Sequence, residues 1–334
     1  MAVPVSFRLI THARCVTQGL MRAVLFVLWT LGMGAGWLVF RPLSSPVTAP
    51  GAPRSPQAGS PLRPTAGNRS SCGAWALHLW ARGVCRILGV RIVATGRMCR
   101  APALHVSNHV GYLDVIVLAA TAPALFVARD DLARWPLLGF LAASTGTVFL
   151  DRTRPRAVVA AGERMAEHFA AGASVIVFPE GTTTDGATVA PFHASLFEPA
   201  RRAQAGDTIP VQAIAVRYEG RPARGARGAQ DETNGRHGTS RGTGPPDARG
   251  TPETKTRTGE GDTSPQPGHD RASHPRAVWT GEATFLPHLW KLLCADGLTA
   301  RIWCAPAVTG FADRRAAAAE ARAWIASVLE RSRK

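Results

Sequence analysis

His109 and Asp114 are the two residues whose types and spacing best suit proton transfer, and they lie five positions apart in the segment SNHVGYLD at 107–114. The apolar residues at 103–107 predict a strand and those at 113–120 predict a helix, so the histidine lies in the turn between them. Catalytic groups collect at the carboxyl ends of strands in open α/β sheets. If Asp114 holds one imidazole nitrogen, the other can take a proton from an attacking hydroxyl, and no serine nucleophile is needed.

A purely structural role for the same pair stays open. Asp114 is also the kind of charge that a helix N-terminus favours, because the helix dipole is positive there. His109 would then be an ordinary turn residue. The spacing of one histidine and one aspartate is by itself a weak signal, since short motifs recur by chance.

A second polar turn follows the apolar residues at 174–178 and has the sequence PEGTTTDG at 179–186. Its amides and hydroxyls would suit an anionic group, as the backbone N–H groups of such turns bind phosphate, although an ordinary polar turn fits the same letters. Arg152 follows the strand predicted at 147–150, where its planar fork of donors could hold a phosphate or simply be solvated. Pro210 stands where a strand begins, and its missing N–H does no harm there.

The hydrophobic pattern supplies alternating strands and helices to position these residues. Such an alternation predicts an α/β sheet with helices covering its faces. Strands are predicted at 90–94, 103–107, 124–128, 147–150, 174–178, 210–216 and 300–304. Helices are predicted at 113–120, 132–143, 155–171, 286–294 and 314–331.

An uncharged run at 23–40 favours a membrane anchor within residues 1–40. As a helix the run would span about 27 Å, slightly less than a bilayer core of about 30 Å. A cleavable signal peptide, a single spanning helix and a helix that enters one leaflet beside the apolar residues at 75–88 all stay open. The arginines on either side of the run do not decide its orientation.

The remaining boundaries follow from composition. Residues 41–71 carry seven prolines and predict a linker. Residues 221–277 contain no Val, Ile, Leu, Met, Phe, Trp, Tyr or Cys, but ten Gly and seven Pro, so this insertion is expected to be disordered. A folded domain is therefore predicted at 72–220, and it resumes at 278–334.

Charge and cysteine content restrict the class of protein. There are 39 Lys and Arg against 23 Asp and Glu, a net charge of +16, which favours anionic partners. Only three of the basic residues are lysines, so the excess can reflect coding bias, and no recognition helix or aromatic platform indicates nucleic acid. The six cysteines form no CxxC pair, which argues against zinc and thioredoxin-like chemistry and favours a reducing cytosolic setting.

Four short segments occur in a specific order: NHxxxLD from Asn108, FLDR ending at Arg152, FPEGT from Phe178 and IPV around Pro210. Each is weak alone, but the ordered set resembles the glycerolipid acyltransferases, specifically the 1-acyl-glycerol-3-phosphate (lysophosphatidate) acyltransferases. The resemblance covers residues 75–220 and resumes after the insertion. It implies an α/β fold with a mixed, largely parallel sheet flanked by helices, preceded by an N-terminal membrane-anchoring helix.

The resemblance also implies roles for individual residues. His109 would be the general base on the acceptor hydroxyl, and Asp114 its orienting partner. Most of the substrate-binding residues would hold the acceptor's head group, and Pro210 would shape the acyl side. The substrate-binding residues would be Asn108, Arg152, Glu180, Gly181, Thr182 and Pro210.

The reaction implied by the resemblance moves an acyl group from acyl-CoA or acyl carrier protein to the free hydroxyl of a lysolipid, first of all 1-acyl-glycerol-3-phosphate. The donor is a substrate, and no metal or other cofactor is expected. The expected partners are the donor, the lysolipid and an anionic membrane, without nucleic acid. The expected location is the cell inner membrane, with the catalytic domain facing the cytoplasm.

One departure from the family pattern bears on the acceptor. Many lysophosphatidate enzymes have Arg or Ser after EGT, whereas Thr183, Thr184 and Asp185 follow here. This form is more similar to a bacterial branch that includes lyso-ornithine lipid acyltransferases, whose acceptor has an amino-acid head group. A lyso-ornithine lipid O-acyltransferase is therefore the alternative enzyme, and a non-catalytic membrane lipid-binding protein is the alternative of another class.

Overall fold

The computed structural model describes residues 5–40, 69–100, 102–135, 138–151, 153–202, 209–220, 273–274, 276–279 and 284–333. All of them belong to one compact unit, formed by residues 1–221 and 271–334. Three of the sequence-based predictions concern residues outside the described ones: Arg152, the linker residues 41–68 and the insertion residues 221–272.

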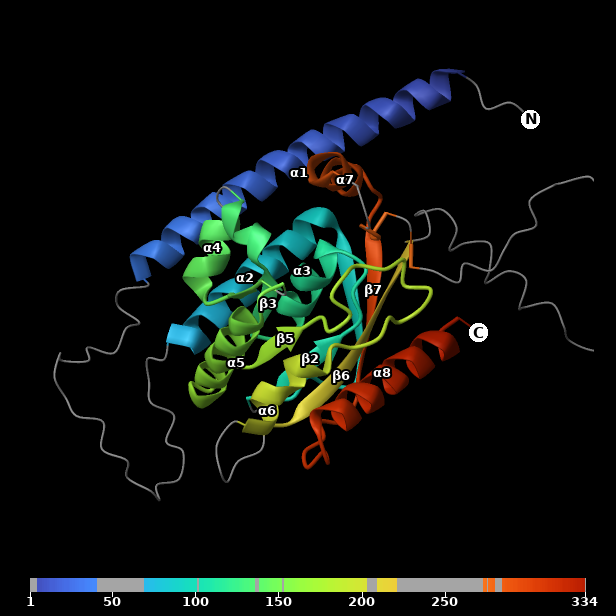
Figure 1. Cartoon of the computed structure of the whole chain (residues 1–334). Coiled ribbons are helices and arrows are strands. Elements are labelled where there is room, and N and C mark those ends of the chain that lie inside the picture. Colours follow the sequence, from blue (N-terminus) through green and yellow to red (C-terminus); the bar gives the residue numbers. More distant parts are fainter. Residues whose placement is uncertain are drawn as a thin grey trace, which may run out of the picture. The chain divides into compact units, whose positions relative to one another are not determined.

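The described residues form a seven-stranded sheet in the order β1-β7-β6-β2-β5-β3-β4 (Figure 1). Neighbouring strands run parallel except β6 and β7, which are antiparallel. The strands are β1 (Val90–Thr95), β2 (Leu104–Ser107), β3 (Leu125–Arg129), β4 (Val148–Leu150), β5 (Val175–Val177), β6 (Val211–Gly220) and β7 (Leu298–Cys304). The predicted mixed, largely parallel sheet is therefore confirmed.

Every residue of the central strands β2 and β5 is buried, including the polar His105 and Ser107. Strands in this position are covered on both faces, as the crossover helices of parallel sheets require. β7 follows the predicted insertion at 221–277, yet it pairs with both β1 and β6. Segments on either side of the insertion therefore build one sheet.

Helices cover both faces of this sheet (Figure 1). They are α1 (Val5–Phe40), α2 (Arg69–Leu88), α3 (Tyr112–Thr121), α4 (Leu138–Thr145), α5 (Pro155–Ala170), α6 (Glu198–Arg202), α7 (Phe285–Leu293) and α8 (Arg314–Arg331), with 3₁₀ helices η1 (Asp130–Arg134) and η2 (Ala194–Phe197). On one face, α2, α3 and α7 pack against Ile176 and Ile214. On the other face, α5, α6 and α8 pack against Leu104 and Val177.

Helix boundaries differ from the sequence-based prediction in three places. The helix predicted at 132–143 is divided into η1 and α4, because Trp135 precedes Pro136 and the residue before a proline is disfavoured in a helix; Trp135 accordingly has φ −72° and ψ 125°. η2 and α6 are short elements that the hydrophobic pattern does not predict. α2 begins at Arg69, so the last residues of the predicted linker at 41–71 are helical.

Among the described residues, α1 is the helix that is long and apolar enough to cross a membrane, over Ala13–Phe40 with a mean hydropathy of 2.0. In Figure 1 it runs past α7, α2 and α4, and it contacts α2 and α7. Most residues of that range are exposed, because one side of the helix faces the domain and the rest faces outward. The predicted apolar N-terminal helix is thus present.

Candidate active site

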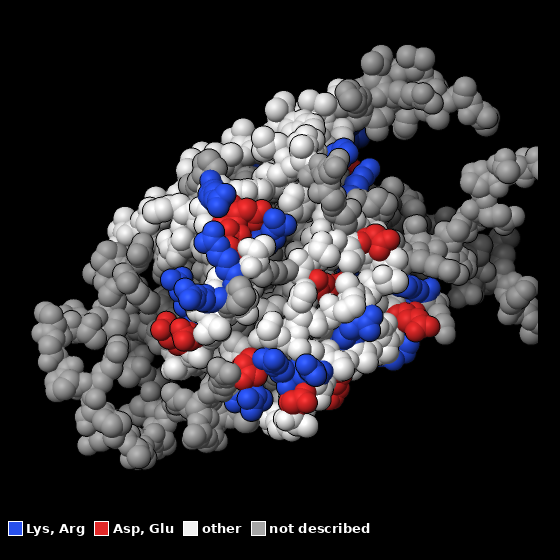
Figure 2. Space-filling model, in the orientation of Figure 1, with Lys and Arg blue, Asp and Glu red and all other residues white. Residues whose placement is uncertain are grey.

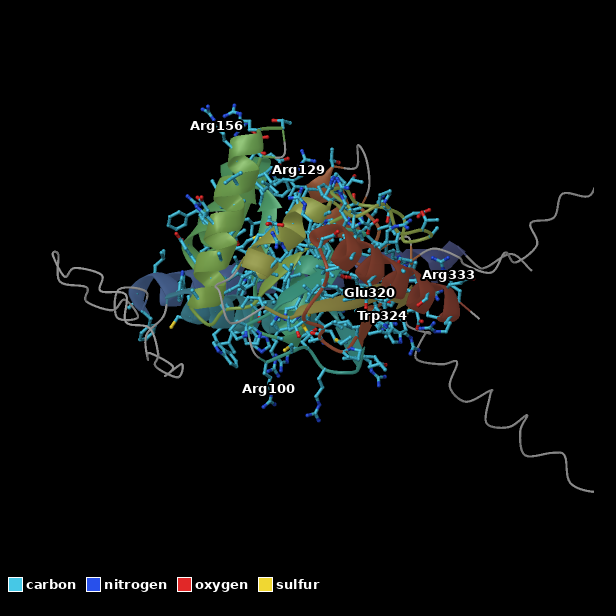
Figure 3. The ribbon with its side chains drawn as sticks, turned by 60° about the horizontal axis from the view of Figure 1, so that its bottom comes forward. Arg100, Arg129, Arg156, Glu320, Trp324 and Arg333 are labelled. Carbon is cyan, nitrogen blue, oxygen red and sulfur yellow. The ribbon has the colours of Figure 1, made fainter. Side chains whose placement is uncertain are left out.

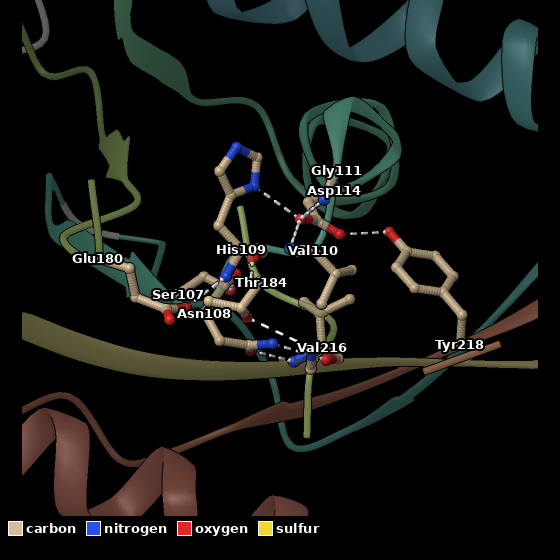
Figure 4. A network of polar contacts seen from close by, with 11 residues as sticks. Ser107, Asn108, His109, Val110, Gly111, Asp114, Glu180, Thr184, Val216 and Tyr218 are labelled. Atoms are coloured by element: carbon tan, nitrogen blue, oxygen red, sulfur yellow. Dashed lines mark hydrogen bonds and ion pairs between the residues drawn. The ribbon is translucent and has the colours of Figure 1, made fainter. Parts of the chain in front are cut away.

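The predicted pair is in contact: His109 Nδ1 lies 2.7 Å from Asp114 Oδ2 (Figure 4). His109 stands in the loop after β2, and Asp114 lies in the first turn of α3. The Asp114 side chain is fully buried, whereas 19% of the His109 side chain is exposed. The dyad therefore joins a buried hydrogen-bond acceptor to a ring that a substrate can reach.

The loop between the two residues closes around the Asp114 carboxylate. Oδ2 also accepts hydrogen bonds from the N–H groups of Val110, at 2.7 Å, and Gly111, at 3.0 Å. Gly111 is the N-cap of α3, so Asp114 also has the structural role of a carboxylate at the positive end of a helix. The structural and the catalytic interpretations are compatible, since one carboxylate serves both.

The second oxygen of Asp114 has a partner from a distant strand. Tyr218 of β6 is fully buried and donates its hydroxyl to Oδ1 at 2.8 Å. Burial first, and then the negative charge of Asp114, raise the pKa of Tyr218 well above its ordinary value, so the phenol stays protonated and donates. The spacing of residues gives no signal for this contact. It depends on the pairing of β2 with β6, in which Ser107 lies opposite Ile214.

His109 is also held from the β5 side. Its backbone N–H donates to Glu180 Oε1 at 2.8 Å, and its carbonyl accepts from the Thr184 N–H at 2.8 Å. The ring stacks on Phe178 with 4.1 Å between the centroids and 16° between the planes. The ring is thereby fixed while the edge that carries Nε2 faces away from Asp114 (Figure 4).

Asn108 and Glu180 both bond to the protein backbone, and their role in substrate binding stays a prediction. Asn108 donates Nδ2–H to Val216 O at 2.9 Å and accepts from the Val216 N–H at 2.8 Å, so its amide pairs with β6. The second Glu180 oxygen accepts from the Ala190 N–H at 2.8 Å, and burial raises the pKa of Glu180. Both side chains are buried, and these hydrogen bonds position the loops that carry them.

The other predicted residues lie at different places. Gly181 and Thr182 line a cavity beside His109. Pro210 precedes β6, and its carbonyl accepts from the Leu104 N–H at 2.9 Å, which is at the amino ends of β2 and β6. The dyad lies at the opposite, carboxyl ends of the strands, so the structure does not bring Pro210 next to it, and the role of Pro210 on the acyl side stays a prediction.

The cavity has a volume of about 530 Å³, and His109, Phe178 and residues 181–183 form part of its wall. Small-molecule sites have volumes of roughly 300–1,000 Å³. The remaining wall is largely apolar and includes Phe26, Met33, Trp37, Leu77, Trp80, Ile116, Leu132, Trp135, Leu138 and Leu141. A wall of this kind suits an aliphatic chain.

Two charged residues outside the sequence motifs, Arg129 and Asp131, also line the cavity. They form an ion pair at 3.1 Å, and their side chains are 69% and 54% exposed. Figure 3 shows Arg129 on the same side of the molecule as Arg156, which lies near the start of α5. Arg129 ends β3, and the rule that ligands bind at the carboxyl ends of strands is the sequence signal that would have selected it.

The arrangement can move a proton. With Asp114 on Nδ1, His109 Nε2 can accept a proton from a hydroxyl in the cavity, and the buried carboxylate stabilises the resulting imidazolium. Among the described residues, no group of three or more His, Cys, Asp or Glu side chains is placed to hold a metal ion.

Residues 91–217, which contain both members of the dyad and the polar turn after β5, match the model of the Acyltransferase family. This part of the chain is therefore similar to the acyltransferase family. The resemblance that the four ordered motifs predict is therefore confirmed.

Curated relatives carry two names. A lyso-ornithine lipid O-acyltransferase of Pseudomonas aeruginosa is 35% identical over 143 residues, which are 43% of this chain and 54% of that protein. A 1-acyl-sn-glycerol-3-phosphate acyltransferase of Neisseria gonorrhoeae is 36% identical over 112 residues, 34% of this chain and 42% of that protein. The chain thus spans about half the length of the curated relatives it matches.

A solved structure has the same fold. It is the crystal structure of the 1-acyl-sn-glycerophosphate acyltransferase PlsC from Thermotoga maritima, with a TM-score of 0.55 over 96% of this chain and 97% of that chain. The two sequences are 14% identical, so the likeness concerns the fold alone. Together with the apolar N-terminal helix, it confirms the predicted fold class.

Proposed function

We propose that this protein is a membrane-associated O-acyltransferase that moves an acyl group from acyl-CoA or acyl carrier protein to the free hydroxyl of a lysolipid. The observation that carries the proposal is the His109–Asp114 dyad in the wall of a largely apolar cavity. The acyltransferase-family match over residues 91–217 supports the type of reaction. The acyl donor is a substrate in this proposal, which includes no further cofactor.

In the proposed reaction, His109 Nε2 takes the proton of the acceptor hydroxyl as the hydroxyl oxygen attacks the thioester carbonyl carbon. Asp114 keeps the proton on Nδ1 and stabilises the imidazolium. When the tetrahedral adduct collapses, the carbon–sulfur bond breaks and the imidazolium returns its proton to the leaving thiolate. The products are a diacyl lipid and a free thiol, without an acyl-enzyme intermediate.

We propose lyso-ornithine lipid as the acceptor. Its head group carries one carboxylate and one ammonium, and the cavity wall holds one cation and one anion, Arg129 and Asp131. The turn after β5 continues with Thr183, Thr184 and Asp185 and has no arginine for a phosphate. The match to the Pseudomonas aeruginosa relative is also longer than the match to the Neisseria gonorrhoeae relative, 143 against 112 residues.

The second candidate acceptor is 1-acyl-glycerol-3-phosphate, the first expectation from the sequence motifs. Arg129 favours it, because a guanidinium binds two phosphate oxygens with its planar fork of donors. Asp131 opposes it, because a carboxylate 3.1 Å from that guanidinium would repel the phosphate.

We infer that α1 lies in one leaflet of the membrane and does not cross it, because α1 is attached to the domain at several points between Gln18 and Trp37. Near its middle, Gln18 Nε2 donates to Ala295 O at 3.2 Å, and Arg22 Nη1 donates to Leu293 O at 3.0 Å and to Ala295 O at 2.6 Å. These carbonyls lie at the last residue of α7 and just after its C-cap, Cys294, where a helix has no internal partners for them.

Farther along α1, two tryptophans join it to α2 and α4. Trp29 Nε1 donates to Trp80 O at 2.9 Å, and Trp37 Nε1 donates to Ser144 Oγ at 3.0 Å. The outward side exposes large apolar side chains, and residues 23–40 of α1 include no charged residue, so this part of the helix is white in Figure 2. A surface of this kind enters one leaflet with the helix axis in the membrane plane. The exposed apolar residues include Leu20, Val24, Leu28, Leu31, Leu38 and Phe40.

We place the enzyme at the cell inner membrane with its domain facing the cytoplasm, since the proposed thioester donors are cytoplasmic. The six cysteines carry no disulfide, as is usual in reducing compartments. The net charge of +16 favours an anionic leaflet.

Acyl transfer by membranes that contain the full chain tests this function. Labelled acyl-CoA or acyl carrier protein is supplied with lyso-ornithine lipid and with lysophosphatidate in parallel, and membranes with His109→Ala serve as the blank. The proposal predicts a labelled diacyl product from lyso-ornithine lipid that the blank does not form. Product from lysophosphatidate alone would move the acceptor to the second candidate. Lysolipid binding without product from either acceptor would favour a lipid-binding protein.

A further inference from the structure

We propose that Tyr218 is a positioning residue for the dyad, holding Asp114 Oδ1 so that Oδ2 stays directed at His109. Its role in catalysis rests on the proposed acyl transfer. Figure 4 shows the chain of contacts: the Tyr218 hydroxyl lies 2.8 Å from Oδ1, and Oδ2 lies 2.7 Å from His109 Nδ1. The carboxylate is thus held at both oxygens.

Asp114 needs this second partner because it is completely buried. Its Oδ2 is already shared by His109 and two backbone N–H groups. Among the described residues, Tyr218 supplies the donor to Oδ1. A buried carboxylate oxygen without a donor is costly, so loss of the hydroxyl would leave Oδ1 unpaired and the carboxylate held through Oδ2 alone.

Strand β6 connects both halves of the site. The Asn108 amide pairs with the backbone of Val216, next to His109 in sequence, and Tyr218 lies two residues farther along the same strand. The Tyr218 carbonyl in turn accepts from the N–H of His274, at 3.0 Å, among the described residues at the end of the predicted insertion. One strand therefore sets the position of the histidine loop and of the carboxylate.

Removal of the phenol has a predictable electrostatic effect. The hydrogen bond from Tyr218 draws negative charge toward Oδ1. Without it, more charge faces His109 on Oδ2 and favours the imidazolium. The acid limb of the pH–rate profile would then move to higher pH.

Tyr218→Phe removes the hydroxyl and keeps the buried ring. We expect kcat to fall about tenfold, KM for the lysolipid to change by less than about twofold, and the acid limb to move to higher pH. Tyr112→Phe is the matched control, since Tyr112 is the other tyrosine of the chain and its hydroxyl bonds to His288 at 2.9 Å. In Tyr112→Phe the acid limb should stay at the wild-type pH, even if kcat of this variant changes. An unmoved acid limb in Tyr218→Phe would overturn the proposal.

A double-mutant cycle separates positioning from general damage to the fold. In an Asp114→Asn background, Tyr218→Phe should cause little further loss of kcat, because the tyrosine acts through the carboxylate. Losses that multiply in the double variant would show that Tyr218 does not act through Asp114.

A third measurement needs no turnover, so it distinguishes this inference from the proposed function. The rate of carbethoxylation of His109 by diethylpyrocarbonate is followed against pH by mass spectrometry of the His109 peptide. Its midpoint should move to higher pH in Tyr218→Phe and stay in place in Tyr112→Phe. Wild-type membranes without acyl transfer would reject the proposed function alone, whereas equal midpoints in all three proteins would reject the role of Tyr218.

Discussion

The two sides of the proposed active site are held to very different degrees. Around His109 the polar groups are buried and bonded: Asp114 has four hydrogen-bond donors, and Glu180 has one backbone partner on each oxygen. On the acceptor side, Arg129 and Asp131 are 69% and 54% exposed and are joined by one ion pair.

This difference suggests that the buried side of the site determines the rate of acyl transfer, whereas the exposed side determines which acceptor is preferred. A fixed proton acceptor is needed for every acyl transfer, and preorganised polar groups supply it. A head group can be recognised by exposed side chains, whose replacement costs little stability. We therefore expect changes near the dyad to lower the rate or the stability, and changes at Arg129 and Asp131 to alter the preference between acceptors.

The largest effect is expected from His109→Ala. Loss of a general base lowers the rate by about 10²–10⁴, or roughly 2.7–5.4 kcal/mol in activation free energy. The measurement is kcat for acyl transfer in membranes with matched protein amounts, with thermal unfolding of the purified variant as the control for folding. A variant within a few fold of the wild-type rate would contradict the proposed role of the dyad. It would also contradict the expectation that changes near the dyad affect the rate most.

Glu180→Gln should have a smaller effect that combines stability and rate. The new amide nitrogen faces one of the two N–H groups, of His109 or Ala190, that the carboxylate now accepts. Losing one such buried bond costs about 1–3 kcal/mol in the free energy of unfolding, and the displaced histidine loop lowers kcat. Denaturant unfolding measures the loss. The exposed Glu163 on α5 provides the control, since Glu163→Gln should stay within about 0.5 kcal/mol of wild type.

The same residue predicts a dependence of stability on pH. Burial raises the pKa of Glu180 in the folded protein, so the folded state binds this proton more tightly than the unfolded chain does. The contribution of Glu180 to stability therefore falls as the pH rises from the ordinary glutamate pKa through the higher folded pKa, and is constant above it. Glu180→Gln removes this slope. If the free energy of unfolding changed with pH in the same way in the wild type and in Glu180→Gln, between acidic and neutral pH, the slope would not come from Glu180.

The sequence predicts the dyad because both members lie within one short segment, where a turn and the first turn of a helix determine their separation. It also predicts all seven strands of the described sheet, since each is a short apolar run. The contact of Tyr218 with Asp114 and the distance of Pro210 from the site depend on the register of β2 against β6. That register is set by packing between segments far apart in the chain, which local patterns do not contain.

The backbone partners of Asn108 and Glu180 could not be predicted for the same reason. A polar residue beside a catalytic histidine suits a substrate contact as well as a structural one. Its actual partners, Val216 and Ala190, become neighbours only after the sheet has formed. The motifs therefore locate the site, while the strand order decides which of its polar groups face the substrate.

The smallest effect is expected from Asp131→Asn. This change tests the exposed acceptor side of the proposed active site. If the ion pair recognises a zwitterionic head group, removal of the negative charge should lower the ratio of kcat/KM for lyso-ornithine lipid to that for lysophosphatidate. An exposed pair contributes at most about 1 kcal/mol, so the ratio should fall by no more than about fivefold, and added salt should reduce the change. Asp130→Asn is the matched control, because Asp130 is similarly exposed and pairs with Arg134 at 3.9 Å. An equal change of the ratio in both variants would mean that general surface charge, and not this pair, selects the acceptor.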